Sequence, residues 1–343
     1  MKVKSATAMA LLLSAFLMLL SGCFEKTHSL YSVDGEAMGT TWHATIAAPS
    51  DPDGELIKLK IEVMLAEINK EMSTYDPQSA LSLFNSEEST AWAPLPESVI
   101  ALIRSAARIS KDTEGAYDVT LGTVMDLWGF GADFKPGNEP DMDTVFEEMN
   151  NVGHQLIAVS KDQTQVRKLA PGLKVDLSSI AKGYAVDRVG TLLEENGIKR
   201  YVFELGGEIR TRGKSADDKP WSIALESPDA TTQVANYRSI AVENAHIATS
   251  GDYRNYREVE GKRVSHLIDG RSGYPIDHEL ASVTVLHGTT EQADAWATAF
   301  MVLGPDETLK RADKTGLAVS MTVRDGDTFV TRDSKAFSAY LAK

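Results

Sequence analysis

In several segments of the chain, hydrophobic residues recur at the spacing of a helix. Over residues 52–72 they form one wide apolar stripe, which is typical of a helix that lies on a core. Its members are Leu56, Leu59 and Val63 together with Ile57, Ile61, Leu65, Ile68 and Met72. The same spacing predicts helices over 96–113, 182–196, 290–303 and 305–315, and a short one that ends at Met149.

Short runs of alternating or β-branched residues, separated by Gly, Pro or Asp, predict the strands. They lie over 41–47, 156–159, 165–168, 173–177, 201–204, 209–213, 221–225, 238–242, 264–268, 281–286, 318–323 and 328–332. A stretch rich in Pro and Gly at 131–143 predicts a surface loop. Because helices flank runs of largely antiparallel strands, the pattern indicates a single α+β body.

The beginning of the chain has the pattern of a secretory signal peptide. Lys2 and Lys4 precede an apolar run over 6–20, which is shorter than the roughly 20 residues that span a bilayer. The run ends in Leu-Ser-Gly-Cys at 20–23, which resembles a bacterial lipobox, and Cys23 is the only cysteine. A lone thiol in an oxidising compartment invites oxidation, and a lipid would cap it; the alternative is a buried or chance cysteine.

This interpretation divides the chain into three parts. We expect residues 1–22 to be removed, residues 23–35 to form the lipidated Cys23 and a polar tether, and residues 36–343 to form one domain. The product is a lipid-anchored protein on the periplasmic side of a bacterial membrane. Phe24, with no aspartate in its place, favours the outer membrane by the rule that such lipoproteins follow.

Composition and charge exclude several classes of protein. Of the 343 residues, 43% are hydrophobic and 24% are charged, which excludes a disordered, collagenous or polytopic membrane protein. Lys and Arg number 35 against 49 Asp and Glu, so the net charge is −14 and the chain would repel a nucleic-acid backbone. A small phosphorylated ligand stays possible, because backbone amides, a lysine and a divalent metal can overcome a diffuse field.

The segment 176–184 joins a predicted strand to a predicted helix. It places Asp176, Ser179 and Lys182 where free backbone amides favour anions, so a phosphate-bearing ligand would suit it. The alternative is an ordinary helix start with a solvated lysine. The segment matches neither a Walker loop nor a dinucleotide-binding glycine motif.

Asp294 and Thr298 stand four residues apart on a predicted helix and therefore share one face. Their oxygens could bind one hard cation, since Mg²⁺ commonly keeps waters and borrows ligand phosphates. The alternative is a helix cap or a solvated face. Zinc is a poor candidate, because the only cysteine, Cys23, is expected to carry the lipid and no pair of histidines has ligand spacing.

His266 stands where a predicted strand ends and a turn begins, a place from which an imidazole can project into a cleft. Because histidine titrates near neutral pH, His266 could accept a hydroxyl proton, or it could be a half-buried structural residue. Tyr75, Tyr117 and Trp128 fall in turn-rich sequence, where their rings could stack on a planar ligand or pack in the core.

Taken together, these segments resemble the ApbE family. Eight motifs occur in the order found there, and the resemblance covers residues 33–335; the motifs lie at 38–42, 72–85, 115–119, 176–183, 204–207, 248–251, 266–269 and 293–298. The resemblance implies a T-fold-like α+β body and an FAD:protein FMN transferase. Such an enzyme splits FAD, releases AMP and joins FMN through a phosphoester to a threonine or serine of another protein.

The resemblance also implies roles for single residues. His266 corresponds to a candidate base, and Mg²⁺ is expected at Asp294, Thr298 and the carbonyl of Ser179. Lys182 stands where some relatives carry an acidic residue. The FAD contacts implied are Met38, Tyr75, Ala116, Tyr117, Asp118, Asp176, Lys182 and Ile268.

Three functions therefore stay open at this point. Transfer to an acceptor is the first, and the expected acceptors are membrane-bound redox subunits such as those of a sodium-pumping NADH:quinone reductase. The second is a Mg²⁺-dependent FAD pyrophosphatase that yields FMN and AMP. The third is a non-catalytic flavin-binding lipoprotein.

Overall fold

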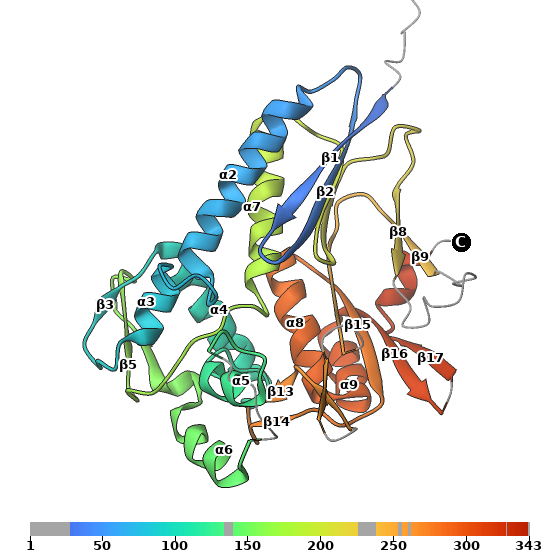
Figure 1. Ribbon diagram of the computed structural model, residues 1–343. Helices are drawn as coiled ribbons and strands as arrows, with labels where there is room; N and C mark the ends of the chain where they lie inside the picture. The colour runs from blue at the N-terminus through green and yellow to red at the C-terminus, as the bar shows by residue number, and fades with distance from the viewer. Residues whose placement is uncertain are drawn as a thin grey trace, which may run out of the picture.

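The computed structural model describes residues 28–133, 140–225, 238–252, 256–259, 262–326 and 328–341. Within these residues the largest sheet has eight antiparallel strands in the order β1-β2-β6-β7-β10-β15-β16-β17 (Figure 1). The strands are β1 Ser29–Ala37, β2 Thr40–Ala48, β6 Tyr201–Leu205, β7 Glu208–Arg212, β10 His246–Gly251, β15 Leu280–His287, β16 Ala318–Asp325 and β17 Thr328–Asp333.

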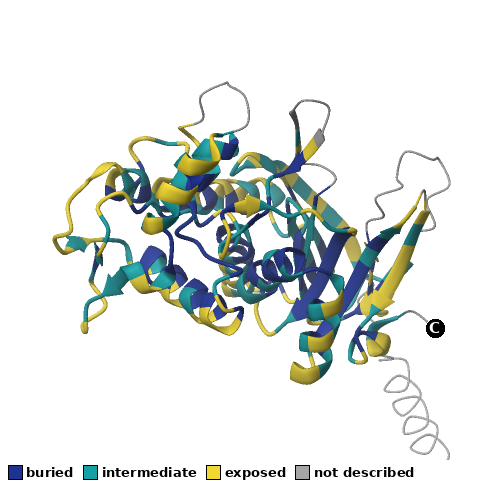
Figure 2. Cartoon of the chain, turned by 90° about the horizontal axis from the view of Figure 1, so that it is seen from below, coloured by how far each residue is buried: buried dark blue, intermediate teal, exposed yellow. Residues whose placement is uncertain are grey.

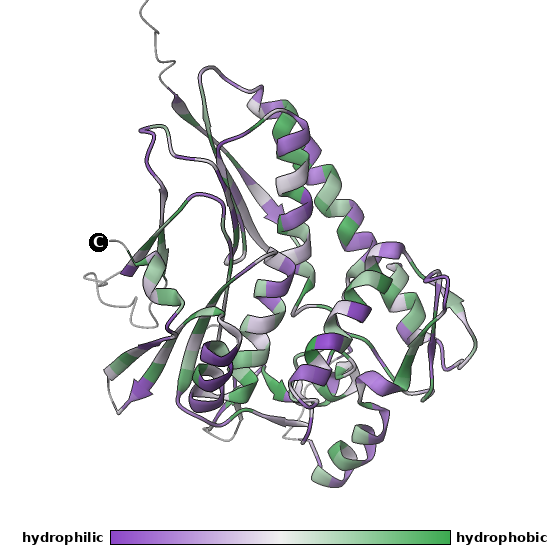
Figure 3. Cartoon of the chain, turned by 180° about the vertical axis from the view of Figure 1, so that it is seen from behind, coloured by the Kyte–Doolittle hydropathy of each residue, from purple (hydrophilic) through white to green (hydrophobic). Residues whose placement is uncertain are grey.

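Different elements cover the two faces of this sheet. Helices α2 (Gly54–Met72), α7 (Ala181–Glu195) and α8 (Thr290–Leu303) cover one face (Figure 1). The mostly hydrophilic α9 (Pro305–Thr315) packs on α8 and β16 at the edge (Figure 3). The other face is covered by the hairpin of β8 and β9 and by the short helix η3, which are Trp221–Leu225, Arg238–Val242 and Phe337–Tyr340.

A second, smaller lobe lies beyond the end of α2 (Figure 1). It contains the short sheet β3-β5-β4 and several helices, of which α4 contacts α8 of the main body. The lobe comprises α3 Ala80–Ser86, β3 Ala93–Pro94, α4 Glu97–Asp112, α5 Gly122–Trp128, α6 Met142–Glu148, η1 Met149–Asn151, η2 His154–Leu156, β4 Ile157–Val159 and β5 Gln165–Lys168. Two small hairpins adjoin it, β11 Tyr256–Val259 with β12 Lys262–Ser265 and β13 Ile268–Asp269 with β14 Tyr274–Pro275.

Helix α8 lies at the centre of the packing, where buried residues gather (Figure 2). Ala295 and Ala299 belong to the apolar cluster formed with α2, α7 and β6, whereas Ala293 and Ala297 belong to the cluster formed with β15 and β16. All four are fully buried. Small side chains on both sides thus let one helix join two parts of the core.

The predicted α+β class and the long helices are confirmed. In α2 the stripe is narrower than predicted: Ile57, Ile61, Leu65, Ile68 and Met72 are buried, and Leu56, Leu59 and Val63 are exposed. One side of a helix faces the core and the adjoining apolar residues lie beyond its edge.

Three of the predictions need correction. The tether predicted over 23–35 is a strand from Ser29 onward, since β1 pairs with β2 along its whole length; the folded body therefore begins before residue 36. The strand predicted over 173–177 forms one bridge, between Leu121 and Lys174, and no ladder. The strand predicted over 264–268 is divided, because Ser265 Oγ accepts the N–H of Leu267 and the chain turns between β12 and β13.

The predicted signal peptide and Cys23 lie outside the described residues, as does part of the predicted loop at 131–143. Among the helices that the structure describes, none combines the length and the apolar character needed to cross a membrane.

Candidate functional site

A cavity of about 1200 Å³ opens where one end of the large sheet meets the small lobe. Its wall is built from the β1–β2 turn, the β6–β7 turn, the end of β10, the first turn of α7 and one face of α8. The small lobe contributes the segment after α2 and the end of α5. The polar and aromatic residues in the wall include Thr40, Tyr75, Asp76, Tyr117, Asp118, Phe130, Asp176, Ser178, Ser179, Lys182, Glu208, Thr249, Ser250, Tyr256, Arg257, His266, Asp294 and Thr298.

The structure brings nearly all residues implied by the resemblance into this one wall. Met38, Tyr75, Tyr117, Asp118, Asp176, Ser179, Lys182, His266, Ile268, Asp294 and Thr298 line the cavity. Ala116 is fully buried behind the wall, where its carbonyl accepts the N–H of Gly270. Trp128 was considered as a ring that could stack on a ligand. It is buried and donates through Nε1 to the carbonyl of Gly273, so it packs in the core instead.

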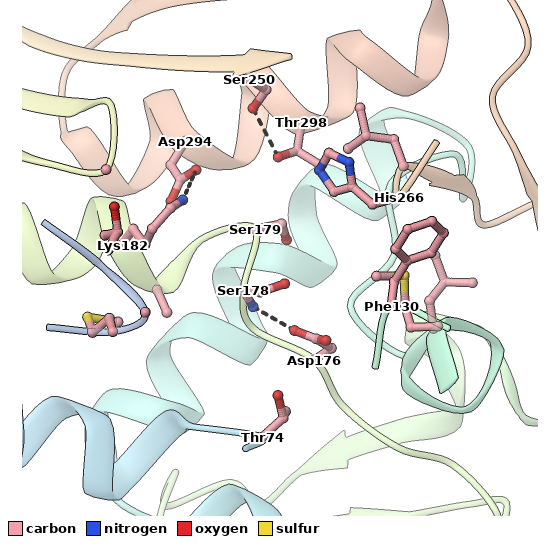
Figure 4. Close-up of a pocket in the computed structure, with 18 of the residues that line it drawn as sticks. Thr74, Phe130, Asp176, Ser178, Ser179, Lys182, Ser250, His266, Asp294 and Thr298 are labelled. Atoms are coloured by element: carbon pink, nitrogen blue, oxygen red, sulfur yellow. Dashed lines mark hydrogen bonds and ion pairs between the residues drawn. The ribbon is translucent and has the colours of Figure 1, made fainter. Parts of the chain in front are cut away.

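Two carboxylates and one ammonium meet in the wall. Lys182 Nζ donates to Glu208 Oε1 at 3.0 Å and lies 3.7 Å from Asp294 Oδ1 (Figure 4). Asp294 Oδ2 accepts the N–H of Gly183 at 2.9 Å. The side chains of Asp294 and Glu208 are each 2% exposed, against 27% for Lys182, so this is a charged cluster largely removed from water.

Burial governs the protonation of this cluster. Burial raises the pKa of Glu208 above its ordinary value, against the opposing effect of the Lys182 ammonium. Burial likewise raises the pKa of Asp294 above its ordinary value, while Lys182 and the Gly183 N–H lower it. Lys182 keeps its proton, because the carboxylates of Asp294 and Glu208 outweigh desolvation and raise its pKa. A further positive charge near the two carboxylates would stabilise both in the ionised form.

The oxygens around Asp294 suit a hard cation. Thr298 lies one turn further along α8, and its Oγ1 is 3.3 Å from Ser250 Oγ (Figure 4). Ser179 lies across the cavity, where its Oγ is 2.9 Å from the hydroxyl of Tyr117. Among the described residues no group of three His, Cys, Asp or Glu side chains could hold a metal. This donor set fits Mg²⁺, which takes one or two carboxylates and completes its shell with waters and phosphates.

Aromatic side chains line the other end of the cavity. Figure 4 shows Phe130 and His266 on the side of Thr298 that is away from Lys182. The rings of Phe130 and His266 meet edge to face with centroids 6.2 Å apart. Tyr75 is 71% exposed and donates from its hydroxyl to the carbonyl of Phe130 at 3.3 Å. Flat rings at this end could enclose a planar ligand.

Asp118 and Asp176 shape the backbone of the wall. The Asp118 carboxylate is buried and accepts four hydrogen bonds, from Ser110 Oγ, the N–H of His154 and both the N–H and Oγ1 of Thr120. Asp176 Oδ1 accepts the N–H of Ser178 at 2.7 Å and so turns the chain into α7. The Asp118 side chain therefore holds its own loop, and a ligand would meet this segment through other atoms.

Close backbone contact brings α7 onto α8 at this place. A Cβ on Gly183 would lie 2.7 Å from the carbonyl carbon of Thr290 and 2.8 Å from Asp294 Cβ. The absence of a side chain therefore lets the Gly183 N–H reach Asp294. On the opposite wall, Met38 has a φ of 51°, a left-handed conformation that is uncommon for methionine.

Sequence reasoning missed Glu208. It follows two glycines and reads as part of an ordinary turn, although it begins the strand β7. A signal was present, because Glu208 alternates with Arg210 and Arg212 and a charge at the start of such a strand can point inward.

The ApbE family model matches residues 38–321. A protein of Haemophilus influenzae named FAD:protein FMN transferase is 41% identical over 342 residues, which cover 97% of this chain and 95% of that protein. A protein of Escherichia coli with the same name is 37% identical over 347 residues, covering 98% of each.

Solved structures agree with these sequence matches. The flavin transferase ApbE of Vibrio cholerae superimposes with a TM-score of 0.83 at 35% identity and covers 92% of this chain and 100% of that one. The ApbE protein of Thermotoga maritima superimposes with a TM-score of 0.80 at 26% identity, with the same coverage.

Proposed function

The chain belongs to the ApbE family and is an FAD:protein FMN transferase, and from this premise we propose that its transfer reaction depends on Mg²⁺ bound in the cavity. The chain uses FAD as substrate and transfers FMN to an acceptor protein. The metal ion, the role of each residue, the bond to a threonine or serine hydroxyl and the location in the cell make up the proposal.

The observation that carries the proposal is the convergence of the implied residues on one cavity. Its two ends differ, with rings at one end and the cluster of Lys182, Asp294 and Glu208 towards the other. FAD offers both kinds of group, since a charged pyrophosphate joins its flavin half to its adenosine half. We place a ring system of FAD at the aromatic end and the pyrophosphate beside Lys182 and Asp294.

Different residues of this chain then have different roles in the transfer. Asp294, Thr298 and the Ser179 carbonyl would hold Mg²⁺, and the Lys182 ammonium would face the phosphates from beside Asp294. When bound, Mg²⁺ neutralises the charge that develops on the pyrophosphate and on the departing AMP. Met38 and Tyr75, which also line the cavity, would contact the dinucleotide.

The transfer exchanges one P–O bond for another. The acceptor hydroxyl oxygen attacks the phosphorus of the FMN half, and a phosphoester forms. The bond from that phosphorus to the bridging oxygen breaks, and AMP leaves with the electron pair. His266 takes the proton of the attacking hydroxyl, because its imidazole faces the cavity next to Thr298 (Figure 4).

A gel assay tests transfer and the metal requirement together. Residues 24–343 are incubated with FAD, Mg²⁺ and a periplasmic domain of a candidate acceptor, and flavin fluorescence is scored on the denatured acceptor with and without EDTA. We expect a labelled band that EDTA abolishes. FMN and AMP released in solution without a labelled band would indicate a pyrophosphatase, and FAD retained without AMP release would indicate a binding protein.

Substitution of Asp294 tests the assignment of the metal site. Asp294→Ala should lose Mg²⁺-dependent turnover far more than FAD binding, because the metal acts mainly on charge that appears in the transition state. Asp306→Ala is the matched control, since that carboxylate is 94% exposed on α9 and pairs with Arg332. Equal turnover of Asp294→Ala and the wild type would remove Asp294 from the mechanism.

We also propose that the enzyme is anchored by a lipid on Cys23 on the periplasmic side of a bacterial membrane. The lipobox-like sequence before Cys23 and the absence of any other cysteine support this location. Globomycin should block processing, and Cys23→Ser should release the protein from the membrane fraction. Membrane-bound Cys23→Ser protein would contradict the anchor.

The proposed acceptors are membrane-bound redox subunits with a periplasmic threonine or serine, as in a sodium-pumping NADH:quinone reductase. An anchored enzyme and a membrane-bound acceptor on the same side meet in two dimensions, which supports this class. The gel assay with subunits of this class, against their Thr→Val variants, tests it directly.

A further inference from the structure

Glu208 is a buried carboxylate in the cavity wall to which the proposed reaction gives no part. Its Oε1 accepts a hydrogen bond from Lys182, whereas its Oε2 is buried and has no hydrogen-bond partner among the described residues. A buried, unpaired carboxylate oxygen destabilises a fold. Its presence in a cavity wall therefore points to a role in the site.

The geometry of Lys182 indicates that role. Its ammonium lies between two buried carboxylates, hydrogen-bonded to Glu208 at 3.0 Å and 3.7 Å from Asp294. Glu208 thus holds the ammonium, and Asp294 Oδ1 keeps a longer ion pair. Asp294 Oδ2 is satisfied separately by the N–H of Gly183.

An ammonium in direct contact with Asp294 would compete with a metal ion. Mg²⁺ binds carboxylate oxygens at about 2.0–2.1 Å, and an ammonium hydrogen-bonded to the same oxygen would occupy its place. If Glu208 were neutral or absent, the attraction between Lys182 and Asp294 in this poorly solvated wall would draw the two together.

We propose that Glu208 is a positioning residue that holds the Lys182 ammonium away from Asp294 and so keeps Asp294 available to a divalent cation. The inference rests on the proposed metal site at Asp294. It assigns Glu208 no contact with FAD or with the reacting atoms.

A second ion pair between the same two elements supplies the matched control. Helix α7 and strand β7 are joined at the cavity by Lys182 and Glu208, and further along by Glu194 and Arg210, whose atoms Oε1 and Nη2 are 2.7 Å apart. The second pair has the opposite polarity, and neither of its members lines the cavity. Glu194→Gln therefore breaks an α7–β7 ion pair without changing the charge around Asp294.

The test is a cycle of metal-binding measurements on the FAD-free protein. Free Mn²⁺ is followed by electron paramagnetic resonance during titration of the wild type, Glu208→Gln, Lys182→Met and the double variant. With Lys182 present, Glu208→Gln should weaken Mn²⁺ binding by about 10–100-fold, the usual effect of removing a group that orients a ligand. In the Lys182→Met background, the same substitution should weaken Mn²⁺ binding by no more than about twofold, which is the deviation usual between independent substitutions.

The controls separate failure of this inference from failure of the metal site. Equal Mn²⁺ binding by the wild type and Asp294→Ala would refute the metal site itself. If Asp294→Ala does lose Mn²⁺ binding, two results would refute the inference. One is that Glu208→Gln binds Mn²⁺ as tightly as the wild type does. The other is that Glu208→Gln weakens Mn²⁺ binding equally with Lys182 and with Met at position 182. Glu194→Gln should bind Mn²⁺ like the wild type.

A single variant keeps the inference testable if Glu208→Gln does not fold. Lys182→Met removes the competing ammonium, so it should bind Mn²⁺ at least as tightly as the wild type. Weaker binding by this variant, with its melting temperature unchanged, would overturn the inference.

Discussion

Replacement of Gly183 by alanine tests whether the contact between α7 and α8 sets the position of Asp294. The added Cβ would lie 2.7 Å from the Thr290 carbonyl carbon and 2.8 Å from Asp294 Cβ, whereas ordinary contacts begin near 3.4 Å. The Thr290 carbonyl oxygen would be nearer still, so the two helices must separate by roughly 1 Å at this point. The hydrogen bond from the Gly183 N–H to Asp294 Oδ2, now 2.9 Å, lengthens with them.

Three effects set the size of the change. Overpacking of a tight contact costs about 1–3 kcal/mol. Weakening a hydrogen bond to a buried carboxylate costs up to about 1.5–3 kcal/mol. Alanine stabilises a helix by about 0.5–1 kcal/mol relative to glycine, which offsets part of this loss. We therefore expect Gly183→Ala to lower the free energy of unfolding by about 2–4 kcal/mol and to weaken Mg²⁺ activation.

Gly190→Ala is the matched control, because Gly190 lies on the same helix and receives the same gain in helix propensity. Its Cβ would meet the side chains of Arg210, with Nε at 2.6 Å, and Tyr201, with the hydroxyl at 2.7 Å, so it overpacks the same helix two turns away without touching α8. Urea unfolding and the Mg²⁺ dependence of transfer would be measured for both variants. The argument is refuted if Gly183→Ala is as stable as the wild type, or if its Mg²⁺ activation is no weaker than that of Gly190→Ala.

Three further predictions follow from the site. His266→Ala should slow transfer by about 10²–10⁴-fold with little change in FAD affinity, and a wild-type rate constant in single-turnover assays would exclude it as the base. Asp118→Asn places an amide against four donors, so it should lower the melting temperature, with about 2 kcal/mol lost; unchanged thermal unfolding would contradict this. Because burial raises the pKa of Glu208 above its ordinary value of 4.5 in the folded protein, the metal-free fold should lose stability as the pH rises above that value. Urea unfolding from pH 5 to 8 should show a shallower slope for Glu208→Gln; an identical slope would rule out this pKa.

The sequence predicted elements best where one face alone meets the core. The helix α2 is an example, since its buried residues recur with helical spacing. The edge strand β1 was missed although Tyr31, Val33, Gly35 and Ala37 alternate with polar residues, because Gly35 and Ala37 supply little apolar surface and half of the segment is polar. The pairing with β2, which no local pattern encodes, makes it a strand.

The wrong strand at 173–177 has a different cause. Leu173, Val175 and Leu177 are buried alternately, as the pattern predicted. However, the backbone of Val175 is bound by the side chain of Asn85, which donates to its carbonyl and accepts its N–H, both at 2.8 Å. Periodicity indicates which side chains are buried and says nothing about which atoms satisfy the backbone.

In the site, too, the sequence identified some residues and could not identify others. The resemblance located Asp294, Thr298 and Lys182, because each falls in a motif with fixed neighbours in the sequence. Glu208 could not be found in this way, because its importance comes from an ammonium 26 positions away in the chain and 3.0 Å away in space. A charged pair between a helix and a strand is a property of the fold.

The burial of α8 also determines how long the site stays intact in solution. Its backbone lies under the sheet on one side and under α7 on the other, and the alanines at these contacts are fully buried. Deuterium should therefore reach the backbone around Asp294 and Thr298 only when the whole body unfolds, whereas the edge strand β17 exchanges by local opening. The side chains of Asp294 and Thr298, which are expected to bind the metal, would thus keep their spacing for as long as the protein stays folded. FAD and the metal could then enter and leave the cavity without any movement of α8.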